Sequence, residues 1–285
     1  MTAPAPLALR VTRVAHLAGH LARGLAIAAF RYGQMSEAAQ RSAIRRWSRD
    51  ILSALGVTVR IHGLAAKPAE ALPPRCLMVS NHVSWMDILV LLSVCPATFV
   101  AKSEIRGWPL VGWLCARVGT LFIERGRRAS ARRTSKIMSD AMQRGTLVCI
   151  FPEGTTTDGL GLARFHAALF QPAVDAAAMV QPVVLRYLHH NGQHCAAPNY
   201  VGETSFLTSM WSTTSAPRMV AEISFLMPFA AAGCDRRVLA RTAESAVAAA
   251  LGAAAAATAA MPGVPPARGH RSPPGTSGDH PGGSP

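Results

Sequence analysis

Acidic residues are scarce in this chain of 285 residues. Its 15 Asp and Glu stand against 29 Lys and Arg, so the formal net charge at pH 7 is +14, and no acidic residue precedes Glu37. Such a charge favours anionic partners: a lipid headgroup surface, an acidic carrier protein or nucleic acid. Because the sequence contains no recognisable nucleic-acid-binding motif, nucleic acid ranks last among these partners.

Aromatic residues make up 6% of the chain and charged residues 15%, although half of the residues are apolar. This is an apolar balance for a soluble enzyme, and it indicates that part of the surface does not face water. At this length we expect one large domain with appendages.

The cysteines include no C-x-x-C pair. Six are scattered, mostly within apolar runs, at Cys76, Cys95, Cys115, Cys149, Cys195 and Cys234. We interpret them as reduced core residues in a cytoplasmic compartment. Residues 189–195 gather three histidines beside one of these cysteines, which is a possible metal site. Asn191-Gly192 in their midst is a hairpin turn signal, so a solvated turn is the better interpretation.

A long apolar run is missing from the N-terminal region. Residues 1–35 mix leucine and alanine with arginine, and residues 24–30 are their apolar run. That run is far shorter than the about 20 residues that a spanning helix needs. The arginines also disfavour a signal peptide, whereas an organelle transit peptide fits the composition. We expect an interfacial amphipathic helix here.

A second helical pattern begins at Ser36. Apolar residues recur at helical spacing at Ile44, Trp47, Ile51 and Leu55, and a basic row runs through Arg41, Arg45 and Arg49. An apolar stripe flanked by arginines suits a membrane surface, and it also suits a surface helix packed on the domain, because core packing requires the same amphipathicity. We assign residues 1–56 to a membrane-associating helical segment.

Short apolar strands alternate with helical patterns across residues 57–251. Strands are predicted at 57–61, 76–79, 98–101, 120–123, 147–151, 180–185 and 219–225, with the first at an edge. Helices are predicted at 88–92, 107–118, 129–143, 165–178 and 235–251. This alternation predicts an α/β fold with a mostly parallel central sheet flanked by helices, in which loops at the carboxyl ends of strands hold the site. Residues 252–285, rich first in alanine and then in proline and glycine, are predicted to be a disordered tail.

A histidine and an aspartate meet where the strand at 76–79 passes into the helix at 88–92. On one continuous helix, His82 and Asp87 would point about 140° apart. They can therefore meet only if His82 lies in the loop and Asp87 in the first helical turn. Ser84-x-x-Asp87 has the form of a capping box, which supports that helix start.

The chemistry available to this pair is general base catalysis. Imidazole titrates near neutral pH, and a carboxylate on its other nitrogen fixes the tautomer. In the simpler alternative, Asp87 only caps a helix and His82 is a hydrogen-bonded loop residue. The H-x-x-x-x-D spacing by itself favours that alternative.

Three further stretches change this balance. Residues 119–125 read Gly-Thr-Leu-Phe-Ile-Glu-Arg, residues 151–156 read Phe-Pro-Glu-Gly-Thr-Thr, and residues 180–183 read Val-Gln-Pro-Val. With the His82 stretch, and in this order, they resemble the four motifs of the glycerolipid acyltransferases, the family of 1-acylglycerol-3-phosphate O-acyltransferase. The resemblance covers roughly residues 57–228, and four motifs in order are a strong signal where each alone is weak.

In that family the histidine deprotonates an acceptor hydroxyl, which attacks an acyl thioester directly, and the aspartate orients the histidine. The resemblance therefore implies that His82 and Asp87 are catalytic. It implies substrate binding by Arg125, Glu153, Gly154 and Thr155. It also implies an acyl carrier protein or coenzyme A donor, a lysolipid acceptor, no metal or bound cofactor, and association with the cytoplasmic face of a membrane.

The acceptor is the uncertain partner, because the chain departs from the family pattern at Thr156, where arginine is the commonest residue. The motifs predict 1-acylglycerol-3-phosphate as acceptor, giving phosphatidic acid. The alternative is a lyso-aminolipid such as lyso-ornithine lipid, which would not need a second guanidinium. Two other classes remain open: a lipid hydrolase using water or Ser84, and a membrane-binding protein without activity.

Overall fold

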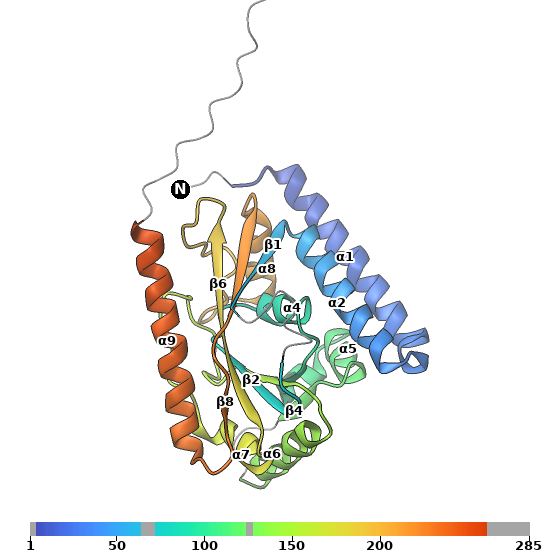
Figure 1. The fold of residues 1–285 in the computed structure, drawn as a ribbon. Coiled ribbons are helices and arrows are strands. Elements are labelled where there is room, and N and C mark those ends of the chain that lie inside the picture. The colour runs from blue at the N-terminus through green and yellow to red at the C-terminus, as the bar shows by residue number, and fades with distance from the viewer. Residues whose placement is uncertain (1–3, 64–71, 124–127, 261–285) are drawn as a thin grey trace, which may run out of the picture.

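The computed structural model describes residues 4–63, 72–123 and 128–260 and has an α/β architecture (Figure 1). Its strands are β1 (Val57–Gly63), β2 (Cys76–Ser80), β3 (Thr98–Lys102), β4 (Leu121–Ile123), β5 (Val148–Ile150), β6 (Met179–His189), β7 (Met219–Phe225) and β8 (Phe229–Ala230). Its helices are α1 (Leu7–Phe30), α2 (Glu37–Ala54), α4 (Met86–Leu92), α5 (Val111–Arg117), α6 (Arg128–Gln143), α7 (Gln171–Asp175), α8 (Phe206–Ser215) and α9 (Arg236–Ala260). Short 3₁₀ helices are η1 (Tyr32–Gln34), η2 (Ser103–Gly107) and η3 (Ala167–Phe170).

The described strands form one sheet in the order β1-β7-β6-β2-β5-β3-β4, with β8 also pairing with β6. Strand β2 is parallel to both β5 and β6, and β3 is parallel to both β4 and β5. Strand β6 is antiparallel to β7 and β8. The predicted mostly parallel sheet is therefore confirmed, with β1 at the expected edge.

Helices cover both faces of this sheet, which is why its central strands are apolar along their whole length. In β2, Met78 packs in a core cluster with α2 and α4, whereas Leu77 and Val79 pack in a second cluster with α6, α7 and α9. Figure 1 shows α9 along one side of the sheet and the α1–α2 pair on the other. The carboxyl end of β2 therefore lies between the two helical layers that cover the sheet.

Strand β6 departs from the prediction that its proline marks an edge or a strand start. Pro182 lies within a central strand, opposite Val79 of β2. On the other side of β6, pairing with β8 ends at Val180 and pairing with β7 begins at Val183. Pro182 thus lies between the residues paired with β8 and those paired with β7. Its lack of a backbone N–H removes no hydrogen bond between strands there.

The helices predicted at residues 165–178 and 235–251 also differ from their predicted extents. The helix expected at residues 165–178 is reduced to η3 and α7, because Pro172 fits only in the first turn of a helix. Conversely, α9 continues to Ala260, past the predicted boundary at residue 252, because alanine is the strongest helix former. The predicted tail from residue 261 onward lies outside the described residues.

Helix α2 packs on the domain through its apolar stripe. Ser36 caps the helix by accepting a hydrogen bond from the Ala39 amide at 3.3 Å. Ile51, Leu52 and Leu55 are buried in the core shared with α4 and the sheet. Of the two interpretations of this stripe, the structure supports core packing for its C-terminal half.

Helix α1 is anchored to the domain by a buried arginine. Arg13 is 5% exposed, and its guanidinium donates to the carbonyl oxygen of Thr214 at 2.9 Å and to those of Ala216 and Pro217. These carbonyls lie at the C-terminal end of α8, where the helix dipole favours a cation. Position 56 is glycine beneath this guanidinium, and a Cβ there would clash with it. The N-terminal segment is therefore part of the packed structure.

Among the described helices, α9 is long and apolar enough by length and composition to cross a membrane. Its apolar side, however, packs on the sheet through Leu239, Ala243 and Val247, which are buried. We interpret α9 as a helix that packs on the sheet by one face and whose hydropathy comes largely from alanine.

Four of the six cysteines are core residues as predicted, and the histidine-rich stretch forms the predicted turn. All six cysteines are free, and four are buried. Burial raises the pKa of Cys76 and of Cys95 to about 12, so both thiols stay protonated at neutral pH. Residues 189–194 form a tight turn in which Gly192 has φ +83° and the His189 amide donates to the Gln193 carbonyl at 2.8 Å.

Candidate active site

The predicted pair meets at the carboxyl end of β2. The Nδ1 atom of His82 lies 2.7 Å from Oδ2 of Asp87. His82 stands in the loop before α4, and Asp87 lies in the first turn of that helix, as the spacing required. The Asp87 side chain is fully buried, whereas that of His82 is 20% exposed, so only the histidine can reach a substrate.

Hydrogen bonds from the surrounding chain fix Asp87. Its Oδ2 also accepts from the backbone N–H groups of Val83 at 2.7 Å and Ser84 at 3.0 Å. Its Oδ1 accepts from the hydroxyl of Tyr187 at 2.7 Å. An ionised carboxylate needs such donors to be stable in the interior.

The capping box is formed only in part. The Asp87 carboxylate reaches back to the Ser84 amide as predicted, but the Ser84 hydroxyl accepts from the amide of Met86 at 3.2 Å and not from that of Asp87. Ser84 is fully buried, so its hydroxyl is not presented to a substrate. This burial weighs against the lipid hydrolase in which Ser84 is the nucleophile.

The imidazole of His82 is held in one orientation. With a carboxylate at Nδ1, that nitrogen carries the proton and Nε2 has a free lone pair, which is the tautomer a general base requires. The ring of Phe151 stacks on the imidazole with centroids 3.9 Å apart and planes 10° apart. This contact leaves Nε2 as the reactive atom.

Glu153 holds the same loop from the other side. It is 3% exposed, its Oε1 accepts from the His82 backbone N–H at 2.7 Å, and its Oε2 accepts from that of Ala163 at 2.7 Å. Burial raises the pKa of Glu153, and these two hydrogen bonds oppose that rise. The successive N–H groups of residues 82, 83 and 84 therefore all donate to one of two buried carboxylates.

The other predicted substrate-binding residues lie beside this loop or outside the described chain. Gly154 follows the strand exit in a turn with φ +69°, which favours glycine, and Thr155 is exposed. The Thr156 hydroxyl donates to the Tyr200 carbonyl oxygen, and the Thr157 amide donates to that of His82 at 2.8 Å. Arg125 lies outside the described residues.

The family comparisons agree with this geometry. The family described as Acyltransferase matches residues 58–186. A lyso-ornithine lipid O-acyltransferase of Pseudomonas aeruginosa is 37% identical over 245 residues, which are 84% of this chain and 92% of that protein. This chain belongs to the acyltransferase family. It is an O-acyltransferase, and the membrane-binding protein without activity, left open by the sequence, is thereby set aside.

Other similar proteins differ in the acceptor that they are named for. A 1-acyl-sn-glycerol-3-phosphate acyltransferase of Neisseria meningitidis is 36% identical over 195 residues, covering 68% of this acyltransferase and 74% of that protein. The crystal structure of a 1-acyl-sn-glycerophosphate acyltransferase from Thermotoga maritima matches with a TM-score of 0.67 at 20% identity, over 88% of this chain and 96% of that one. The latter likeness supports the α/β fold.

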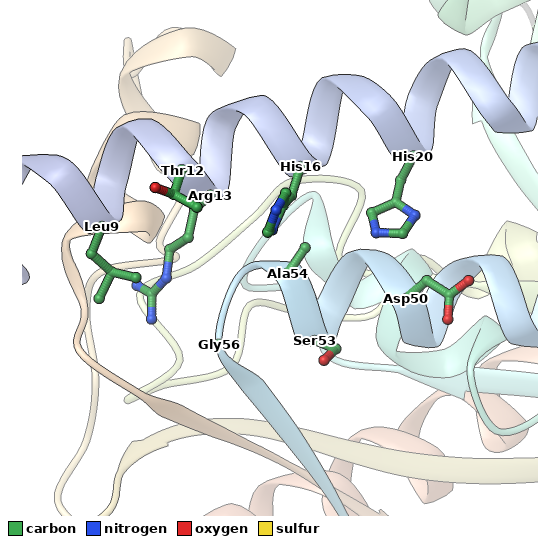
Figure 2. A pocket seen from close by; sticks show the side chains of 9 residues that line it. All are labelled: Leu9, Thr12, Arg13, His16, His20, Asp50, Ser53, Ala54 and Gly56. Atoms are coloured by element: carbon green, nitrogen blue, oxygen red, sulfur yellow. The ribbon is translucent and has the colours of Figure 1, made fainter.

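A separate cavity of about 410 Å³ lies between α1 and α2 (Figure 2). The side chains of His16 and His20 from α1 and of Asp50 from α2 line it, and Asp50 pairs with Arg23 at 3.1 Å. No residue of the 82–87 loop lines this cavity, so it is distinct from the active site of the acyltransferase.

Sequence patterns did not identify three residues that hold the candidate site. Asn81 is fully buried, and its side-chain amide exchanges hydrogen bonds with the backbone of Leu185 at 2.8 and 2.9 Å. Phe151 stacks on His82, and Tyr187 binds Asp87. Only Asn81 and Phe151 stand within the recognised motifs. Tyr187 lies 100 residues from its partner in an ordinary apolar strand, so no local signal marks it.

Replacing Glu153 by glutamine should loosen the loop that carries His82. Glu153 accepts a hydrogen bond at each carboxylate oxygen, whereas the NH2 group of glutamine is a donor and would face a backbone N–H without an acceptor. We expect Glu153→Gln to lose about 1–3 kcal/mol of stability and most activity, whereas Glu203→Gln, at an exposed site, should change neither. Thermal denaturation and steady-state kinetics measure the two effects. An unchanged melting temperature with only a raised acceptor KM would show that Glu153 binds the acceptor directly.

Proposed function

We propose that this acyltransferase moves a fatty acyl group from a thioester of acyl carrier protein or coenzyme A to the free hydroxyl of a lysolipid, with His82 as general base. The observation that carries the proposal is the 2.7 Å contact between His82 Nδ1 and the buried Asp87 carboxylate. It leaves Nε2 to accept the proton of the acceptor hydroxyl.

The chemistry follows from this arrangement. As Nε2 takes the proton, the acceptor oxygen attacks the thioester carbonyl carbon, and the tetrahedral intermediate expels the donor thiolate. The proton on the imidazolium can then pass to that thiolate, which restores the base. The Asp87 carboxylate stabilises the imidazolium between these steps. No covalent acyl-enzyme is needed.

The acceptor that the geometry favours is a zwitterionic lyso-aminolipid such as lyso-ornithine lipid. The turn after β5 carries Thr156 where the family commonly has a guanidinium, and the Thr156 side chain is engaged with the Tyr200 carbonyl. Two residues on, Asp158 is exposed in a loop tied to the His82 carbonyl through Thr157. An exposed carboxylate at this loop suits an ammonium group better than a phosphate.

Lysophosphatidic acid is the second candidate acceptor. It is supported by the family motifs and by the Neisseria meningitidis protein, which is named for that activity. Arg125 would then bind the phosphate.

Exposed apolar side chains on and beside α8, between the loop that carries His82 and α1, suit a lipid membrane. Trp108, Leu207 and Trp211 are 42%, 67% and 41% exposed, and we call them the α8 face. The Phe206 ring lies 6.4 Å from that of Trp108 and 5.3 Å from that of Trp85, which belongs to the 82–87 loop.

A cation completes the α8 face. The Arg10 guanidinium from α1 sits 3.8 Å from the Trp211 ring. Tryptophan favours the membrane interface, and arginine favours anionic lipids. We assign this face to the cytoplasmic leaflet, where a lysolipid could enter the site without leaving the bilayer.

Removing the base should abolish transfer and spare the fold. We expect His82→Ala to lose about 10²–10⁴-fold in kcat or more, because no other group replaces the base, while His190→Ala in the exposed turn should behave as wild type. Thioester consumption with a lysolipid acceptor measures the rate, and circular dichroism checks folding. Near-native turnover by folded His82→Ala would rule out the mechanism.

Two loop variants test the acceptor. If the acceptor is a lyso-aminolipid, Asp158→Asn should raise its KM about tenfold, and Thr156→Arg should lower its turnover while improving lysophosphatidic acid use. Asp175→Asn, at an exposed site elsewhere, is the control. Wild type and variants are measured on both lysolipids side by side. A wild-type preference for lysophosphatidic acid would reverse the assignment, and unchanged ratios throughout would show that neither residue selects the headgroup.

Membrane binding should depend on the α8 face. Leu207→Asp places a charge in the first turn of α8, where the helix tolerates it, and should lower binding to anionic vesicles about tenfold. Val238→Asp, at a 44% exposed position on α9, should leave binding unchanged. Flotation with phosphatidylglycerol-containing vesicles compares the two. Equal binding by both variants would contradict this surface, and wild-type protein that resists carbonate extraction would argue for a spanning helix.

A further inference from the structure

Strand β6 continues past the end of β2 and brings the hydroxyl of Tyr187 to Asp87. Pairing between β2 and β6 ends at Ser80 and Val183, whereas β6 continues to His189. Tyr187 is four residues past Val183, about 13 Å further along a strand. The buried Asn81 side chain replaces the lost strand pairing by bonding both backbone groups of Leu185. Leu185 and Tyr187 therefore lie on the same face of β6, directly under the loop.

The contact between Tyr187 and Asp87 is fully enclosed. Tyr187 is 1% exposed and Asp87 is 0% exposed, and their oxygens are 2.7 Å apart. Three donors converge on Oδ2 of Asp87, namely His82, Val83 and Ser84. Oδ1 takes its hydrogen bond from the tyrosine on the sheet. Both carboxylate oxygens are thus held, Oδ2 by the loop that carries His82 and Oδ1 by the sheet.

We propose that Tyr187 is a positioning residue of the catalytic pair: its hydroxyl donates to Asp87 Oδ1, orients the carboxylate toward His82 Nδ1 and limits how strongly the pair holds a proton. This inference rests on the proposed role of His82 as base. A hydrogen bond to one carboxylate oxygen draws charge from the other, so the imidazolium is stabilised less than by an isolated carboxylate. The imidazolium therefore releases its proton to the leaving thiolate more readily.

The chemistry of the surroundings keeps Tyr187 a donor. Burial and the adjacent Asp87 carboxylate raise the pKa of Tyr187 well above its usual value, so the hydroxyl stays protonated. The other titratable groups near Asp87 are His82 in the loop, Glu153 after β5 and Cys149 on β5. Burial also raises the pKa of Cys149 well above its usual value, so its thiol does not titrate beside the pair.

The test is Tyr187→Phe, which keeps the ring and removes the hydroxyl, measured as kcat, both KM values and the pH profile of kcat/KM from about pH 5 to about pH 9. We expect kcat to fall about 10- to 100-fold with KM values for lysolipid and thioester within about twofold. The acid limb of the profile should move to higher pH, by up to about one unit. Tyr32→Phe, a half-buried tyrosine outside the site, should leave all of these unchanged.

A purely structural role for the hydroxyl would lower the melting temperature but leave the pH profile and kcat in place at assay temperature, and that result would overturn the inference. A double-mutant cycle gives a second check, because Tyr187→Phe should add little to Asp87→Asn if the tyrosine acts through the aspartate. Fully additive losses would overturn it too. The parallel His82→Ala measurement separates the two proposals: activity in His82→Ala removes the proposed function, whereas an inactive His82→Ala with an unaltered Tyr187→Phe removes only this inference.

Discussion

The hydrogen bonding of the buried Asp87 carboxylate is the interaction on which the candidate active site depends. Removing an ion from water costs several kcal/mol even after the protein relaxes, so the structure around Asp87 must supply strong donors. It does so through the imidazole, two backbone amides and a tyrosine hydroxyl. Each donor comes at a fixed position, and together they determine the path of the loop that carries His82.

The second buried carboxylate, Glu153, holds the same loop from its other side. It accepts the amide of His82, while Asp87 accepts the amides of the next two residues. Three consecutive N–H groups thus find charged acceptors, and the loop has little freedom to move its imidazole. In this arrangement Glu153 fixes the shape of the loop that carries His82. Catalysis by positioning requires such rigidity.

Two arginines of α1 have different surroundings. Arg13 is buried and donates hydrogen bonds to the carbonyl oxygens at the end of α8. Arg10, three residues earlier on the same helix, stays near the surface over Trp211. Residues three apart lie on the same side of a helix, so Arg10 and Arg13 both face α8. One short segment therefore both completes the fold and extends a surface suited to anionic lipid.

The sequence alone determined the alternation of strands and helices, the mostly parallel sheet, the family and the meeting of His82 with Asp87. These follow from local periodicity and from the four motifs taken together. Tertiary structure decided the rest, because the deciding contacts join residues distant in the chain. Tyr187 reaches Asp87 across 100 positions, and Arg13 reaches Thr214 across 201. The central place of Pro182 likewise depended on which strands pair on either side of β6. Hydrophobic pattern specifies which face of an element is buried, but the partner that a buried polar group finds there is fixed only when the elements pack together.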